Sequence, residues 1–528
     1  MEKKRRSFIT GAAILAFAGI VCKIIGVLFR VWAAGTIGEA GMEYYEVVFP
    51  FYSFLLILSS SGIPTAISKM VAERIAVGDW ASGKRVFRRS LLALSLIGII
   101  STAVMYLASD VITVNLVGLP SQSSIIFKAL SPALFFVSVL CAYRGYLQGL
   151  QKMAGTGVSQ IAEQVFKCIF GLWLAAYFIR TTSDPIMGAV GALLGISISE
   201  AAALIIMMLF RYKHRRDCMP LDAERKPRQN ERVISKMLAI AVPITLGASI
   251  LPITSIIDVD MIYAMTNIDN VGQSYVALST YVRSIINLPA SLTVALAISL
   301  VPAISAARAR MDEQGVQRAS TMGVKLSMII GLPCAVGLYV LGAPIVNMIF
   351  RSIEPSTLEI VERLFKVASF TVIFISLVQT TTGALQGIGK QWIPMVCLLI
   401  GAVCKVVTNY VLLPIAEINI VGASWSNIAC YGVAGILDTI FLVKYTKMKM
   451  NIWDVFIKPV LGSAVMGAVV YFVYKFLYSI HPGTIVTLVS VVIGIGVYLA
   501  MIYVLRMFTK DEMAYLPLNR RRRKEKAE

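Results

Sequence analysis

The chain has 528 residues, of which 57% are hydrophobic and 15% charged, and its mean hydropathy is +0.77. This composition excludes an ordinary soluble domain and predicts a helical membrane protein with many spans. The net charge of +20 would suggest a nucleic-acid partner in a soluble protein, but here the basic residues gather in the connections between apolar segments. We therefore expect topology signals and contact with anionic membrane lipids, and no nucleic-acid partner.

The apolar segments predict an all-α membrane protein with about fourteen transmembrane helices. The expected spans cover residues 8–34, 46–68, 90–109, 124–147, 156–179, 186–210, 233–262, 273–304, 321–350, 367–387, 391–414, 419–443, 455–478 and 483–507.

The first expected span carries two cations, Lys23 and Arg30, which lie two helical turns apart and share a face with Gly19 and Gly26. A charge in the middle of a span costs about 2.5–3.5 kcal/mol, so it normally faces a polar cavity or a partner. The glycines leave room for another helix or a bound head group. We interpret this face as the wall of a cavity for an anionic ligand, with ion pairing to acidic residues elsewhere as the alternative.

The charges of the connections predict the orientation of the chain. The connection after the second span, the loop over residues 211–232 and the tail over 508–528 are rich in Lys and Arg. The first connection, GEAGMEYYE, has glutamates and no basic residue. By the positive-inside rule, both termini are expected in the cytoplasm.

An internal repeat is visible in the sequence. The segment GYLQGLQK at residues 145–152 matches GALQGIGK at residues 383–390. At the same offset Lys167 aligns with Lys405, and Pro64 aligns with Pro302. The repeat predicts two parallel six-helix lobes followed by two C-terminal helices. The expected division is an N-terminal lobe at 1–210, a basic linker at 211–232, a C-terminal lobe at 233–443, a helix pair at 444–507 and a basic tail at 508–528.

The segment YVRSIINLPASL places Asn287 one turn after Arg283, with Pro289 just beyond. We expect Arg283 and Asn287 to line a cavity, with structural pairing of Arg283 as the alternative. Prolines in or near the spans predict bent helices, and Pro64, Pro289 and Pro302 are the expected hinges.

Further charged residues fall within the expected spans. Glu163 precedes Lys167 by one turn, which favours an ion pair within the helix. Lys405 has no such partner, so we expect it to contact the ligand or to bond between helices. Asp258 and Asp260 point to different sides of their helix and therefore do not form a carboxylate pair. One of them is expected to balance a cation or to bind a coupling ion.

The sequence contains no Walker motif, no HExxH motif and no CxxC pair. We therefore expect no catalytic residue, no cofactor and no metal site, and an ATP-driven pump is excluded for this chain alone.

The segment from Lys23 to Glu73, which includes KIIGVLFR and GIPTAISK, resembles the polysaccharide-transporter branch of the multidrug/oligosaccharidyl-lipid/polysaccharide (MOP) exporter superfamily. It is similar to the stage V sporulation protein B and lipid II flippase groups. The LQGxxK motifs at 147–152 and 385–390 carry the same resemblance, which covers essentially all of the spans. The resemblance implies an alternating-access flippase for undecaprenyl-pyrophosphate-linked sugars in the bacterial cytoplasmic membrane, acting in cell-wall or spore-cortex synthesis.

Lipid II, the peptidoglycan precursor, is the cargo that the resemblance favours. Lys23 and Arg283 match basic positions that line the cavity of lipid II flippases, and Arg30 fits the sporulation-type pattern. Residues 49–61 lack the arginine that these flippases carry on their second helix. We expect the protein to act as a monomer.

Other functions compete with this interpretation. A MATE-like, cation-coupled multidrug exporter would need an acidic cavity. A membrane glycosyltransferase or polymerase would usually carry a large outer loop with carboxylates or histidines. A scaffold that does not transport would leave the cations within the spans unexplained.

Overall fold

The structure is a computed structural model that describes residues 2–213, 233–266 and 270–508. The described part of the chain is helical and contains no strand. It divides into two compact units, one made of Met1–Ala264 with Asn270–Val276 and the other of Met265–Asp269 with Ala277–Glu528. Most of the expected linker and of the expected tail lies outside the described residues.

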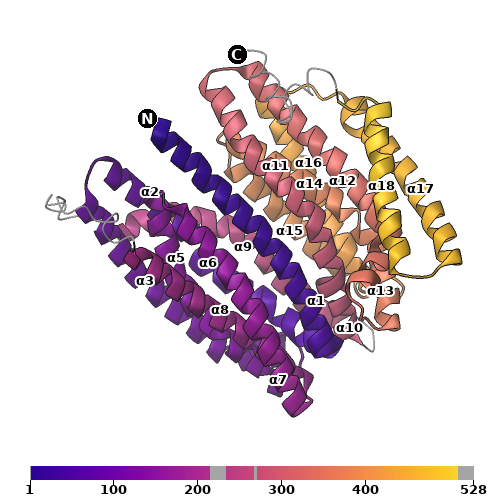
Figure 1. The fold of residues 1–528 in the computed structure, drawn as a ribbon, viewed down its shortest axis with the longest axis horizontal. Coiled ribbons are helices and arrows are strands. Elements are labelled where there is room, and N and C mark those ends of the chain that lie inside the picture. Colours follow the sequence, from indigo (N-terminus) through magenta and orange to yellow (C-terminus); the bar gives the residue numbers. More distant parts are fainter. Residues whose placement is uncertain (1, 214–232, 267–269, 509–528) are drawn as a thin grey trace. The chain divides into compact units, whose positions relative to one another are not determined.

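The first unit packs α1 alongside α6 and α8, and its apolar core joins α2, α3, α5, α8 and the start of α9 (Figure 1). Its elements are α1 (Glu2–Ser60), α2 (Gly62–Ala76), α3 (Trp80–Leu107), α4 (Ser109–Val111), η1 (Ile112–Leu116), η2 (Ser121–Ser124), α5 (Ile125–Gly149), α6 (Met153–Phe166), η3 (Lys167–Gly171), α7 (Leu172–Thr182), α8 (Pro185–Lys213), α9 (Val233–Met265) and α10 (Val271–Val276).

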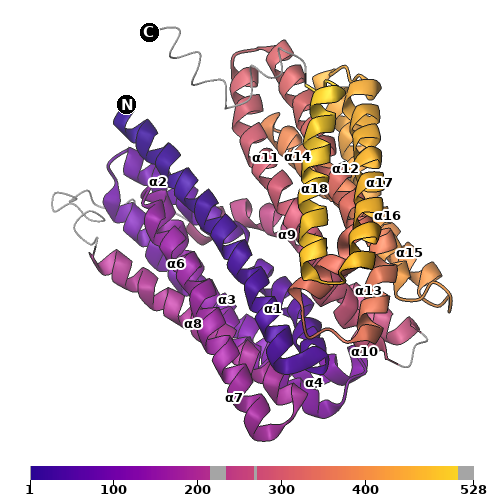
Figure 2. The ribbon, with the colours of Figure 1, turned by 45° about the vertical axis from the view of Figure 1, so that its right-hand side comes forward.

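In the second unit, α17 and α18 lie side by side and pack against α12 (Figure 2). The hydroxyl of Tyr498 on α18 donates to the carbonyl of Ile329 on α12 at 2.9 Å. The elements of this unit are η4 (Ala277–Val282), α11 (Arg283–Ala309), α12 (Glu313–Ile349), α13 (Pro355–Ala368), α14 (Thr371–Gly387), α15 (Trp392–Leu412), α16 (Val421–Thr446), η5 (Trp453–Ile457), α17 (Lys458–Ile480) and α18 (Thr484–Val504).

Among the described residues, 12 helices are long and apolar enough to cross a membrane. The all-α, multi-pass class is therefore confirmed, whereas the count of about fourteen is not. One apolar helical stretch, Phe17–Ala76, covers the first two expected spans and bends at Gly38, whose φ of 70° suits a residue without a Cβ. In addition, α14 has only 17 residues.

The contact-based division also differs from the expected lobes, because α9 belongs to the first unit. The N-terminal half of α9 packs against the start of α2, where the N–H of Gly62 donates to Thr245 at 3.3 Å. The division into two lobes of six spans therefore stays a prediction.

The duplicated glycine motif makes the same close helix contact in both units. A Cβ on Gly145 would lie 2.8 Å from the carbonyl oxygen of Pro64 in α2. A Cβ on Gly383 would lie 2.8 Å from the carbonyl oxygen of Ala297 in α11. The position equivalent to Pro64 is thus Ala297, and the sequence alignment of Pro64 with Pro302 is wrong in register.

The expected hinge prolines lie within helices. Pro64 occupies the first turn of α2, just after the break at Ser61, where a missing N–H disrupts no helical hydrogen bond. Pro289 and Pro302 lie inside α11. Their role as hinges stays a prediction.

Gly195 on α8 makes a close contact that a single methyl group should disrupt. A Cβ at this position would lie 2.2 Å from the Cα of Gly171 in η3, and backbone atoms cannot rotate away. We expect Gly195→Ala to destabilise the protein by about 1–3 kcal/mol, measured as thermal unfolding of the purified protein.

Gly496→Ala is the matched control, because a Cβ there meets nothing within 4 Å. This control variant should be as stable as the wild type or slightly more so, since alanine favours a helix over glycine. Equal unfolding temperatures for both variants would contradict the packing of α8 against η3.

Candidate functional site

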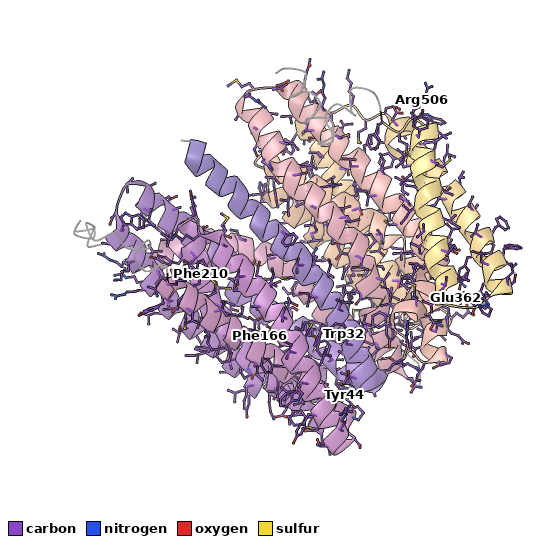
Figure 3. All side chains as sticks on the ribbon, viewed as in Figure 1. Trp32, Tyr44, Phe166, Phe210, Glu362 and Arg506 are labelled. Carbon is purple, nitrogen blue, oxygen red and sulfur yellow. The ribbon has the colours of Figure 1, made fainter. Side chains whose placement is uncertain are left out.

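Charged side chains from several membrane helices gather inside the first unit, where α1, α5, α6, η3 and α8 pack together. Figure 3 labels Trp32 on α1 and Phe166 at the end of α6, two of the helices that contribute to this region. The charged residues are Arg30 and Glu46 on α1, Arg144 on α5, Glu163 on α6, Lys167 in η3 and Glu200 on α8.

The bend of α1 allows Arg30 to pair with an acidic residue of the same helix. Arg30 Nη2 lies 3.3 Å from Glu46 Oε1, and Glu46 is only 3% exposed. The segment expected as an acidic outer connection is therefore helical, and its last glutamate is buried. Arg30 keeps 24% side-chain exposure, so it is both ion-paired and accessible to a ligand.

Arg144 forms the tightest polar contacts of the group. Its Nη2 lies 2.9 Å from Glu163 Oε2, and its Nε donates to Ser159 Oγ at 3.2 Å. The Arg144 and Glu163 side chains are 14% and 17% exposed. The pair thus joins α5 to α6 within the membrane-spanning region. Sequence reasoning missed Arg144, although a basic residue inside an apolar segment, directly before the repeated motif, was the available signal.

Lys167 does not form the ion pair with Glu163 that the spacing suggested. Its ammonium lies 4.5 Å from the centre of the Phe29 ring and 5.5 Å from that of Phe49. The cause is local, because Glu163 is held by Arg144 and a π-helical turn begins at Lys167, which changes the helical phase. Lys167 is half-buried and has no carboxylate partner among the described residues.

Glu200 adds a further carboxyl group beside the Arg144–Glu163 pair. The residue is 6% exposed, and its Oε2 has no hydrogen-bond partner within the described part of the chain. Glu163, Arg144 and Lys167 are its electrostatic neighbours. No role could be predicted for Glu200 from the sequence, because the partners of a single acidic residue in a span depend on how the helices pack.

The other predicted residues of the first unit take no part in the contacts described above. Lys23 is exposed and forms no hydrogen bond or ion pair with any residue that the structure describes. A Cβ on Gly26 would approach Gln164 of α6 at 3.9 Å. Asp258 on α9 is 3% exposed, whereas Asp260 is half-buried. The expected roles of Lys23, Asp258 and Asp260 stay predictions.

The remaining predicted residues belong to the second unit. Arg283 is the first residue of α11 and directly follows the π-helical η4, and Asn287 is exposed one turn later. Lys405 on α15 is 5% exposed. A further buried cation, Lys325 on α12, is 2% exposed and lies 5.9 Å from the centre of the Phe508 ring. Sequence reasoning missed Lys325, which lies at the end of an expected span.

Among the described residues, no group of three or more His, Cys, Asp or Glu side chains is arranged to hold a metal ion. The chemistry that these side chains offer is therefore electrostatic. Cations in a low-dielectric region bind anions strongly, and phosphate groups are ligands that Lys and Arg side chains suit.

Comparison with known proteins gives matches along nearly the whole chain. Residues 8–308 match the family model described as polysaccharide biosynthesis protein, and residues 233–411 match the MatE model. The uncharacterized membrane protein YabM of Bacillus subtilis is 27% identical, covering 97% of this chain and 96% of that protein. Lipid II flippase MurJ of the same organism is 23% identical, covering 93% of this chain and 94% of that protein.

Stage V sporulation protein B of Bacillus subtilis is 22% identical, over 97% of this chain and 98% of that protein. In fold, the chain is similar to lipid II flippase MurJ in an inward closed conformation, with a TM-score of 0.70 and 16% identity over 93% of this chain and 98% of the other. The resemblance read from residues 23–73 is thereby confirmed.

Proposed function

This chain belongs to the polysaccharide biosynthesis protein family, and we propose that it is a flippase that moves a lipid-linked oligosaccharide across the bacterial cytoplasmic membrane. The family match, its relatives and its apolar helices make it a multi-pass membrane transporter of the MOP superfamily. The proposal adds the class of cargo and the residues that hold it.

The observation that carries the proposal is the setting of Lys167. This cation lies within a membrane-spanning segment, and aromatic faces rather than a carboxylate contact its ammonium. An ammonium that contacts no carboxylate directly in such a place favours an anionic ligand, and Glu163 and Glu46 act on it electrostatically from further away. Arg30 is close enough to repel Lys167 electrostatically, so the two cations lie near one another in the first unit, with Glu46 and Glu163 as their acidic neighbours.

A pyrophosphate head group fits these cations. It carries several negative charges and many acceptor oxygens, and charge-assisted hydrogen bonds to Lys and Arg are the strong kind. In the second unit, Arg283, Asn287 and Lys405 are the proposed contacts. The polyprenyl tail would remain in the lipid while the head group crosses, and Asp258 or Asp260 would balance charge or bind a coupling ion. Both termini are proposed to face the cytoplasm.

Lipid II is the proposed cargo. A relative that aligns along 93% of this chain is a lipid II flippase, and the charge argument suits any polyprenyl pyrophosphate sugar. Lys23 and Arg283 are the residues that the resemblance assigns to head-group binding.

A MATE-like multidrug exporter is the second candidate, because residues 233–411 match the MatE model. Such an exporter for cationic drugs would need a binding region with excess negative charge. Lys167 and the exposed part of Arg30 favour an anionic cargo instead.

Native mass spectrometry of the purified protein tests the proposed cargo. Lys167→Met keeps most of the length of the side chain and removes its charge, so we expect at least about tenfold weaker binding of lipid II. Lys366→Met is the control, since Lys366 is exposed and pairs with Glu362 on the surface of α13. Lipid II binding that is equal in wild type and Lys167→Met would contradict the assignment of Lys167.

A further inference from the structure

Among the described residues of the second unit, one carboxyl group lies in the interior. Asp438 on α16 is fully buried, with 0% exposure. Its Oδ2 accepts one hydrogen bond, from Thr382 Oγ1 on α14 at 3.4 Å. Its Oδ1 has no hydrogen-bond partner in the part of the chain that the structure describes. An ionised carboxylate in this position would be poorly stabilised, because buried charges need a partner or several hydrogen bonds.

The helices around Asp438 supply no counter-charge. Four helices, α12 to α15, pack against α16. Their side chains next to the carboxyl group are Thr381 and Thr382 on α14 and the thiol of Cys397 on α15. The Thr381 hydroxyl is already used, because it donates to the carbonyl of Leu377 at 2.8 Å.

The residues of α14 include no acidic or basic side chain. No basic side chain of α12, α13, α15 or α16 forms an ion pair with Asp438 among the described residues. Lys405 lies on α15 two turns beyond Cys397, which is about 12 Å along the helix. The basic residues of these helices are Arg318, Lys325, Arg363, Lys366, Lys405 and Lys444.

The internal repeat shows how this setting differs from that of the first unit. In the sequence alignment that pairs the two glycine motifs, Thr382 is equivalent to Arg144 and Cys397 is equivalent to Ser159. In the first unit, Arg144 holds the carboxylate of Glu163 at 2.9 Å. In the second unit, a threonine hydroxyl and a thiol take these positions, and neither group provides a positive charge. Among the described residues Asp438 therefore has no neighbouring cation, whereas the equivalent part of the first unit contains Arg144.

We propose that Asp438 is a proton-binding site of the second unit. A bound proton removes the charge and needs no further ligand, so it suits a closed pocket of two hydroxyls and a thiol. A metal cation would require more oxygen ligands than these neighbours offer. On the proposed transport function, a proton that binds and leaves Asp438 during the cycle would be a coupling ion. Proton binding itself can be measured without any cargo.

Infrared difference spectroscopy of the full-length purified protein tests this proposal. We expect the wild type at about pH 7 to show the C=O stretch of a protonated carboxyl group, which exposed carboxyl groups do not show because they are ionised there. Asp438→Asn should lose the Asp438 component of this band, while any component from another buried carboxyl group, such as Glu200, stays. The Asp438 component should not respond to added sodium. Thr382→Val should keep the band and shift its frequency, since one hydrogen bond to the carboxyl group is removed.

Asp454→Asn is the matched control, because Asp454 forms an ion pair with Lys458 and should contribute no protonated band. Asp438→Asn should also unfold at the wild-type temperature, since a neutral amide replaces a neutral acid. An unchanged band in Asp438→Asn would overturn the proposal, as would a band that sodium removes. These readouts do not depend on transport, so the proposed cargo can fail while the proton site stands.

Discussion

Arg30→Ala is expected to abolish transport of the lipid-linked sugar. Arg30 is a partly exposed cation of the first unit and an electrostatic neighbour of Lys167, and its loss removes charge-assisted bonds to the head group. The same change leaves Glu46 buried without its partner, which we expect to cost about 3–5 kcal/mol of stability. Transport is measured in cells that depend on this protein, together with its level in the membrane.

A second substitution separates binding from stability. In the double variant Arg30→Ala/Glu46→Gln the buried acid is neutral, so we expect thermal stability to recover while transport remains absent. Glu46→Gln alone should retain the cation and therefore much of the transport. If the double variant transported normally, Arg30 would be a structural partner of Glu46 and would play no part in binding cargo.

A large loss of stability is also expected from Arg144→Ala. This change removes the guanidinium that pairs with Glu163, so that Glu163 and Glu200 lie in the interior of the first unit without their closest cation. We expect a loss of about 3–5 kcal/mol, measured as thermal unfolding of the purified protein. Arg363→Ala is the control, because Arg363 is exposed and bonds to the carbonyl of Glu417 at 3.3 Å.

Removing the charges of both Arg144 and Glu163 tests whether the stability lost in Arg144→Ala comes from their ion pair. Arg144→Met/Glu163→Gln should recover most of the stability lost in Arg144→Ala, because a buried ion pair often contributes little net stability compared with neutral residues. A double variant as unstable as Arg144→Ala would show that the contact of Arg144 with Ser159, or its packing, is the main contribution.

Much of the fold follows from the sequence. Apolar runs of membrane length predict the helices, because backbone groups in lipid must be satisfied within their own segment. The repeated glycines predict equivalent close packing, and Gly145 and Gly383 do make equivalent contacts with α2 and α11. The register of this repeat could be predicted only in part, since Ala297 rather than Pro302 takes the place equivalent to Pro64.

The candidate site could be predicted less well from the sequence, because its ion pairs depend on local backbone geometry. The pairing of Arg30 with Glu46 requires the bend at Gly38. The acidic residues around this bend instead predict an outer loop. The position of Lys167 depends on the π-helical turn that begins at this residue. No residue pattern in the sequence predicts this turn. Arg144 lies close to the end of an expected span, where a basic residue is usually interpreted as a signal for membrane orientation.

A translocation assay tests the central claim most directly. The purified full-length protein is placed in liposomes that carry lipid II, and a membrane-impermeant reagent reports when the head group reaches the outer surface. We predict exposure well above that of protein-free liposomes, with a strong reduction in Lys167→Met and none in Lys366→Met. Exposure equal to that of empty liposomes, in a protein that still binds lipid II, would contradict the account.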